Sequence, residues 1–332
     1  MESTLRPMTL GEILDRTAQL YRTHFLLFAG IFAVYSGVVL VLNLAQIGLG
    51  ELLKAEHLAK YAVLMTAFLT VFNLLILFLL FGAATAAISR AVAWVHLGEP
   101  ATIRGAYQNI LPRLGSYLWL MTITAFRVYT PLVLLYAGFF GTLAFYGLRQ
   151  LGTQAGAAAQ PAVNPQTAII IAMVFIIFFL LLIPVSIYTI LMSLRYSLAI
   201  PASVVENMKA LQAIRRSIEL AKGSWGRIFL LALLVGIIKL GLVGVTQFFV
   251  IVAAFKHPGQ PLGPGILATS QVIGFFTNSF LGPIWATGIT LFYYDQRVRK
   301  EGYDIEWMMQ AAGLVAPATQ QVPQQNTGAA HE

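Results

Sequence analysis

Six stretches of this chain, each more than 20 residues long, carry almost no charged side chains. A helix needs about 20 apolar residues to cross the ~30 Å hydrocarbon core of a bilayer. The spans must be helices because lipid offers the backbone no hydrogen-bond partners. We therefore expect an all-α integral membrane protein with six transmembrane helices and short cytoplasmic interfacial helices. The predicted spans are about 25–47, 61–88, 117–147, 167–194, 226–254 and 267–293.

The basic residues predict how these helices are oriented. Fifteen of the 21 lysines and arginines fall at the two ends of the chain or in the connections after the second and fourth spans, and four fall on the other side. Because cytoplasmic segments carry the excess of Lys and Arg, we expect both termini in the cytoplasm and the chain in a prokaryotic cytoplasmic (inner) membrane. This topology explains the net charge of +8, so no nucleic-acid partner is expected. Residues 1–311 form the predicted membrane domain, and the low-complexity residues 312–332 form a disordered tail.

A repeated pattern divides the membrane domain into three units. The segment "RTAQLYRTHF" from Arg16 resembles "RSIELAKGSW" from Arg216, and each precedes a span. The pattern predicts three copies of an amphipathic helix, an outward span and a returning span, over 9–99, 104–206 and 211–306. The alternative is that any protein with an even number of spans repeats cationic segments on its cytoplasmic side.

Short amphipathic helices are predicted ahead of the odd-numbered spans. The first begins at Thr9 with Glu12 three residues later, which is the pattern of a capping box. Its residues Ile13 and Leu20 lie at helical spacing, and we expect such helices to lie along the membrane interface. The residues assigned as interfacial anchors are Arg16, Arg22, Arg216, Lys222, Trp225, Tyr294, Arg297, Arg299 and Trp307.

The stretch "LFYYDQRVRKEGYDIEWM" follows the last span and concentrates charge and aromatic side chains. We expect Tyr293 and Tyr294 in the aromatic belt of the membrane, with the basic residues after them holding this end in the cytoplasm. Asp295 and Arg299 are spaced as an i,i+4 ion pair, and Gly302 can end the helix. The alternative is a docking site for a partner protein.

This C-terminal stretch also carries a resemblance, together with "MTLGEILDRTAQLYRTHF" and "AIPASVVENMKALQAIRRSIELAKGSWGRIF". The chain resembles the polytopic membrane domain of the glycerophosphodiester phosphodiesterase membrane-domain family and its stand-alone relatives of unknown function. The hydrolase activity of that family belongs to a separate soluble barrel with a His-Arg and Glu-Asn signature. This chain has neither pairing and no room for that barrel, so the resemblance does not imply the activity.

Residues for catalysis or metal binding are scarce. The chain has no cysteine, no two of its five histidines share a helix face at i,i+4, and no Asp or Glu lies inside a predicted span. Metal sites and paired-carboxylate chemistry lack the necessary side chains. We therefore expect no enzymatic activity, no metal and no cofactor.

Prolines and two cations stand out within the spans. Pro131, Pro184 and Pro283 each free a backbone carbonyl four residues earlier, which needs a partner in lipid. Lys239 lies near the centre of the fifth span, where a lysine costs about 2.5–3.5 kcal/mol. The candidate intramembrane anion or lipid site consists of Lys239, Arg127, Asn278 and Gln247. The alternatives are an Arg127 that only reaches the headgroups and a Lys239 without a role.

Two functions remain open on these grounds. The first is a non-enzymatic membrane scaffold or lipid-interacting accessory protein, whose partners are anionic lipid headgroups and possible other membrane proteins. The alternative is a transporter or channel-like protein for a small or amphiphilic solute. The absence of carboxylates within the spans favours the first.

Overall fold

Helices make up nearly all of the chain that the computed structural model describes, which is residues 6–55, 59–154, 165–256, 262–303 and 305. No strand occurs in these ranges. The helices are α1 (Leu10–Thr23), α2 (Phe25–Ala55), α3 (Ala59–His96), α4 (Ile103–Ile110), a 3-10 turn (Leu111–Arg113), α5 (Leu114–Gln154), α6 (Pro165–Tyr196), α7 (Ala199–Val205), α8 (Ala210–Ala221), α9 (Trp225–Thr246), α10 (Phe248–Lys256) and α11 (Pro264–Glu301).

Six helices are long and apolar enough to cross a membrane, which confirms the all-α polytopic fold. Several are longer than the predicted spans: α5 has 41 residues, and α3 and α11 have 38 each. The fifth predicted span differs, because the helix ends at Thr246 and restarts at Phe248 as α10. The three span prolines lie inside continuous helices. Gly302 ends α11 with φ of 65°, as predicted.

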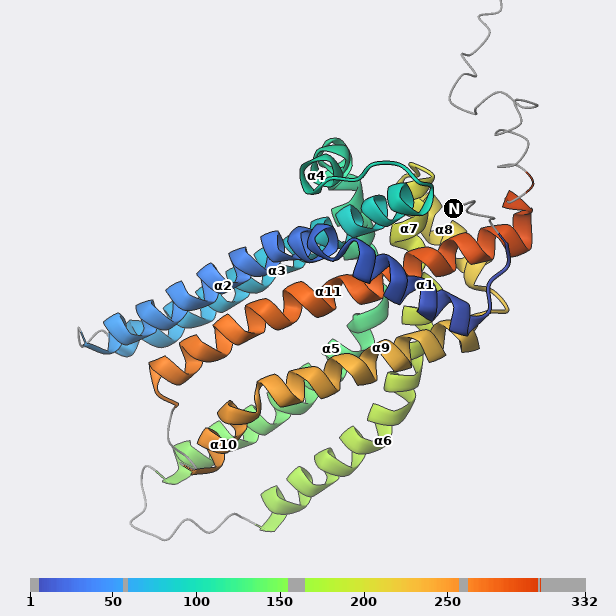
Figure 1. The fold of residues 1–332 in the computed structure, drawn as a ribbon. Coiled ribbons are helices and arrows are strands. Elements are labelled where there is room, and N and C mark those ends of the chain that lie inside the picture. Colours follow the sequence, from blue (N-terminus) through green and yellow to red (C-terminus); the bar gives the residue numbers. More distant parts are fainter. Residues whose placement is uncertain (1–5, 56–58, 155–164, 257–261, 304, 306–332) are drawn as a thin grey trace, which may run out of the picture.

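The short helices α1, α4, α7 and α8 gather at one end of the bundle, which we call the capped end (Figure 1). The opposite end, where α2 and α5 finish, is the distal end. Thr9 and Glu12 form the predicted capping box of α1. The apolar faces of the short helices are covered by protein, since Ile13, Ile110 and Ile214 are almost fully buried. They therefore pack on the long helices, and their position at the membrane interface stays a prediction.

Contacts among the helices follow a cyclic order. The short helix of each predicted unit packs on the returning helix of the unit before it: α4 on α3, α8 on α6, and α1 on α11. The outward helices do the same, with α5 on α3, α9 on α6, and α2 on α11. This order agrees with three units arranged in a ring, and superposition of the three units stays a prediction.

Packing is uneven around this ring. The helices α2, α3, α9 and α11 together with the four short helices form what we call the packed body, which holds most of the buried core. The distal part of α6 lies apart from the packed body (Figure 1), and the hairpin of α5 and α6 is little buried within its apolar windows. In the most apolar windows of these two helices only 6% of the residues are buried, against 44% in α11.

Candidate functional site

The carbonyl that Pro131 frees on α5 has a partner on α6. The Tyr188 hydroxyl donates a hydrogen bond to the Arg127 carbonyl oxygen at 3.1 Å. Of the three carbonyls that span prolines were predicted to free, this one therefore has the expected donor. Tyr188 itself was not predicted, because only the register between α5 and α6 places it opposite Arg127.

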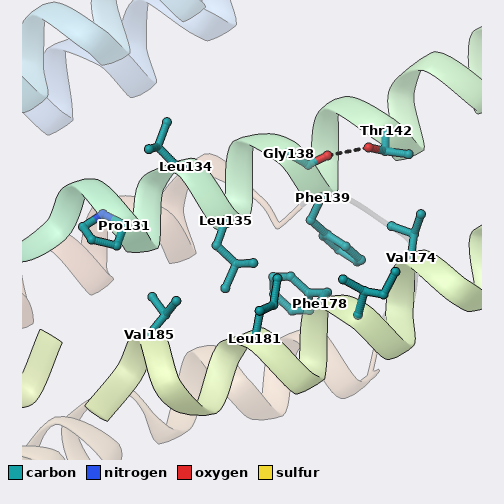
Figure 2. A pocket seen from close by; sticks show the side chains of 11 residues that line it. Pro131, Leu134, Leu135, Gly138, Phe139, Thr142, Val174, Phe178, Leu181 and Val185 are labelled. Atoms are coloured by element: carbon teal, nitrogen blue, oxygen red, sulfur yellow. Dashed lines mark hydrogen bonds between the residues drawn. The ribbon is translucent and has the colours of Figure 1, made fainter. Parts of the chain in front are cut away.

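An apolar groove of about 490 Å³ runs between α5 and α6 (Figure 2). Its polar atoms are already used: the Thr142 hydroxyl donates to the Gly138 carbonyl at 2.6 Å. The remaining surface is aliphatic or aromatic, as suits a hydrocarbon chain. The residues that line it are Pro131, Leu134, Leu135, Gly138, Phe139, Thr142, Val174, Ile177, Phe178, Leu181 and Val185.

Arg127 lies in line with this groove. It precedes Pro131 by four residues, and Leu135, Gly138 and Thr142 continue the same face of α5 at helical spacing. The Arg127 side chain is exposed and makes no hydrogen bond or ion pair with the described residues. From Arg127, 20 residues of helix span ~30 Å, one hydrocarbon thickness. An apolar groove with a free guanidinium at its capped end is therefore the candidate functional site.

The other residues of the predicted anion site do not join Arg127. Lys239 is exposed on α9, on the face that carries Ile228 and Val235, and has no polar partner in the described ranges. The Gln247 side chain accepts a hydrogen bond from Ser270 Oγ at 2.9 Å. Asn278 donates to the Gly274 carbonyl at 3.0 Å. No hydrogen bond links any two of the four predicted residues within the part of the chain described.

Residues 291–298 of the C-terminal stretch form a largely buried hub and not a membrane-facing belt. Tyr293 and Tyr294 are at most 1% exposed. The Tyr293 hydroxyl donates to Glu206, and the Tyr294 ring lies 5.1 Å from the His96 ring, centroid to centroid. The prediction of an aromatic belt is corrected here, because the short helices of the capped end cover this part of α11.

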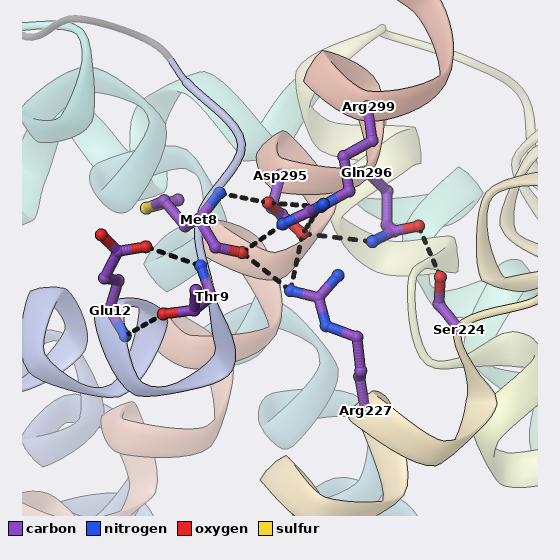
Figure 3. A network of polar contacts seen from close by, with 8 residues as sticks. All are labelled: Met8, Thr9, Glu12, Ser224, Arg227, Asp295, Gln296 and Arg299. Atoms are coloured by element: carbon purple, nitrogen blue, oxygen red, sulfur yellow. Dashed lines mark hydrogen bonds and ion pairs between the residues drawn. The ribbon is translucent and has the colours of Figure 1, made fainter.

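Asp295 is fully buried and is held by two arginines (Figure 3). Arg299 Nε lies 3.0 Å from both carboxylate oxygens, as the i,i+4 spacing predicted, and Arg227 Nη2 lies 3.1 Å from Oδ2. The Met8 amide donates to Oδ1 at 2.7 Å. Both arginines also donate to the Met8 carbonyl, at 2.5 and 2.9 Å. The carboxylate thus joins the N-terminal segment to the start of α9 and the end of α11.

A second charge cluster lies on the other side of α11. Arg216 contacts Glu206 at 3.1 Å and Glu301 at 2.5 Å. Arg297 contacts Glu301 at 3.2 Å and Glu206 at 3.7 Å, and its guanidinium lies 3.9 Å from the centroid of the Tyr303 ring. Two carboxylates and two guanidinium groups balance each other, so this cluster connects helices and leaves no net charge for an anion.

The predicted interfacial anchors therefore separate into two groups. Arg22, Lys222 and Trp225 are exposed and can reach headgroups, while Arg16 is partly buried and bonds Gln19 at 3.0 Å. The others contact protein groups at the capped end, and of these Arg299 is still exposed. These are Arg216, Arg297, Arg299 and Tyr294. Trp307 and the predicted tail 312–332 lie outside the described residues.

The described residues contain no group of three or more His, Cys, Asp or Glu side chains placed to hold a metal ion. No protein-family model, no characterised protein and no solved structure matches this chain. The resemblance to the glycerophosphodiester phosphodiesterase membrane domain therefore stays a prediction, and the site has to be interpreted from its own chemistry.

Proposed function

We propose that this protein is a non-enzymatic, lipid-interacting scaffold of a prokaryotic cytoplasmic membrane, with its termini and capped end in the cytoplasm. The single observation that supports this best is the groove between α5 and α6, with the unpaired Arg127 guanidinium in line with it. A phospholipid with an anionic headgroup has matching parts, an acyl chain and a phosphate. Arg127 would hold the phosphate and the groove would hold one acyl chain.

The positions of the groove and of Arg127 along α5 agree with the depths of an acyl chain and of a headgroup in one leaflet. Between Pro131 and Thr142, which line the groove at its two ends on α5, the helix rises by ~16 Å, or about one leaflet of the hydrocarbon core. The phenol of Tyr188 lies beside the Arg127 backbone, and amphipathic aromatic rings are enriched at headgroup depth. The exposed cations Arg22 and Lys222 of the capped end would face the same leaflet.

The proposal is tested by counting lipids retained on the purified protein by native mass spectrometry. We expect phosphatidylglycerol to be retained in preference to phosphatidylcholine. One cation near the surface contributes ~1 kcal/mol, so Arg127→Gln should reduce that preference about five-fold. Lys239→Gln removes another exposed intramembrane cation and serves as the matched control. Equal retention of the two lipids by the unaltered protein would contradict the proposal.

A second pair of variants tests the acyl-chain part. Leu135→Trp fills the groove, whereas Val133→Trp places the same side chain at a neighbouring exposed position outside it. We expect Leu135→Trp to lower retention of both lipids and Val133→Trp to leave it unchanged. If the two variants behave alike, the groove does not hold the chain and Arg127 acts on headgroups alone.

The alternative is a transporter or channel-like protein for a small or amphiphilic solute. One observation favours it: Asn43, Asn73 and Gln271 form hydrogen bonds to one another between α2, α3 and α11, inside the candidate spans. Proteoliposomes placed in an osmotic gradient of glycerol would distinguish the two functions. Swelling faster than that of protein-free vesicles would favour transport, and equal rates would favour the scaffold.

A further inference from the structure

Amide side chains form a connected row between α2, α3 and α11 in the distal half of the packed body. Asn43 donates to Gln271 at 2.9 Å, and Asn73 donates to Asn43 at 3.0 Å and to Gln46 at 3.2 Å. Gln46 donates to Thr70 at 2.9 Å. We call these five residues the amide row. It runs toward the distal end of α2, where that helix finishes.

A small cavity of about 40 Å³ lies next to the inner end of this row. Polar side chains of Ser36, Gln271 and Asn278 line it, together with Tyr35. Gln271 belongs to both the row and the cavity, so the two are continuous. A buried water needs roughly 10–15 Å³ of probe-occupied volume and two to four polar partners. The cavity meets both conditions.

Two buried oxygen atoms, one lining the cavity and one in the amide row, have no hydrogen-bond partner among the described residues. They are Ser36 Oγ and Asn73 Oδ1. Other hydroxyls in the same bundle bond the carbonyl four residues earlier, as Thr277 and Ser279 do on α11 at 2.9 and 2.7 Å. Ser36 is only 2% exposed and does not do so. An unsatisfied polar group in hydrocarbon costs several kcal/mol, which a water molecule would remove.

Toward the capped end the polar lining stops at aromatic side chains. The rings of Phe32, Tyr35 and Phe81 pack edge to face on one another, with centroids 5.8 to 6.2 Å apart. Phe32 also lies so close to Gly282 that a Cβ added there would come 2.1 Å from a Phe32 ring carbon. This packing closes the cavity on its inner side.

We propose that the cavity beside Ser36 binds water and that the amide row is a half-channel through which water enters from the distal end. Ser36 and Gln46 are ten residues apart on α2, which is ~15 Å of helix and about half of the hydrocarbon thickness. The aromatic packing at Phe32 prevents a continuous pore. This inference does not depend on the lipid-binding role of α5 and α6.

Because the chain has no cysteine, single cysteines can test this directly in proteoliposomes. Ser36→Cys changes one atom and leaves the amide row intact. Val41→Cys on the same helix is 65% exposed, toward lipid, and Ile31→Cys is buried on the inner side of the aromatic packing. Thiol reagents react with the thiolate, which acts as the nucleophile or metal ligand, and apolar surroundings disfavour its formation.

We expect Ag⁺, a membrane-impermeant thiol reagent about the size of a water molecule, added at the distal side to modify Ser36→Cys at least ten-fold faster than either control. The same reagent at the capped side should not modify it. If Ser36→Cys reacts no faster than Val41→Cys, the row is dry and the proposal is wrong. Should Ser36→Cys fail to fold, Val39→Cys, which also lines the cavity and leaves the amide row intact, takes its place with the same controls and the same two outcomes.

Discussion

The packed body and the α5–α6 hairpin differ in which side chains they bury. The most apolar of the six spans, α6, is among the least buried, whereas the least apolar, α11, is the most buried. In α11 the buried set includes Asp295, Gln296 and Thr290. In the hairpin, large apolar side chains such as Phe126, Phe140 and Leu180 are exposed.

The physical reason is that lipid tails are as apolar as a protein core, so apolar side chains gain little by leaving them. Polar and charged groups gain much more, because hydrocarbon offers them no partners. Helices that carry such groups therefore gather in the packed body, while the hairpin stays in lipid. The comparison predicts that substitutions of equal size have unequal effects in the two regions.

The largest effect is expected at Asp295. Asp295→Ala leaves Arg227 and Arg299 without their carboxylate. Removing one partner of a buried ion pair costs about 3–5 kcal/mol, and because the two arginine side chains are 29% and 36% exposed, we expect a cost at the lower end of that range. Thermal unfolding in detergent should show a much lower midpoint than for Asp15→Ala, which removes an exposed carboxylate of α1. Equal midpoints for the two variants would show that the hub of the capped end does not stabilise the fold.

A glycine pair tests the comparison more directly. Gly282→Ala forces a methyl group against Phe32, and overpacking of this kind costs about 1–3 kcal/mol. Gly138→Ala in the hairpin meets nothing within 4 Å, so it should stabilise α5 by up to ~1 kcal/mol through helix propensity. Unfolding midpoints that shift in opposite directions for the two variants would support the contrast between the two regions. A lower midpoint for Gly138→Ala than for the unaltered protein would contradict it.

A smaller effect is expected within the hairpin itself. Tyr188→Phe removes the donor to the Arg127 carbonyl, and hydrogen bonds between membrane helices average ~0.6 kcal/mol, with a maximum near 1.7. Tyr129→Phe alters an exposed hydroxyl nearby on α5 and is the control. If denaturant midpoints for Tyr188→Phe and Tyr129→Phe coincide, water or lipid already satisfies that carbonyl.

The smallest effect is expected at the start of α1. The backbone hydrogen bond from Thr9 and the bond from Arg6 hold the pKa of Glu12 below its usual value. A lowered folded pKa contributes stability that is present above about pH 4.5 and is lost as the pH falls below it. Between pH 7 and pH 3.5 the unfolding temperature of the unaltered protein should therefore fall by slightly more than that of Glu12→Gln. Identical pH profiles would mean that this capping box contributes nothing measurable.

Features that depend on neighbouring residues were predictable from the sequence. The six spans follow from lengths of uncharged chain, and the capping box, the Asp295–Arg299 pair and the Gly302 helix end follow from spacing. The need of the Arg127 carbonyl for a donor followed from Pro131. Each of these rests on rules that act within a few residues along one helix.

Features that depend on how helices meet were not predictable. Tyr294 has the spacing and composition of a belt residue, and only the cover of short helices shows that it is buried. The Arg227 contact with Asp295 joins two helices, and the amide row joins three. The groove needs the register between α5 and α6, which no local pattern contains.

The hydrogen bond between the Met8 amide and the Asp295 carboxylate has a consequence for biosynthesis. Its amide and the Asp295 carboxylate are 287 positions apart in the chain. At about 5–20 residues per second, a ribosome needs roughly 15–60 s to add the residues between them. During that interval α1 has no α11 to pack against, and the helices already inserted lack their contacts with α11. We therefore expect the contacts of α1 and α2 with α11 to form only after α11 has been made and inserted.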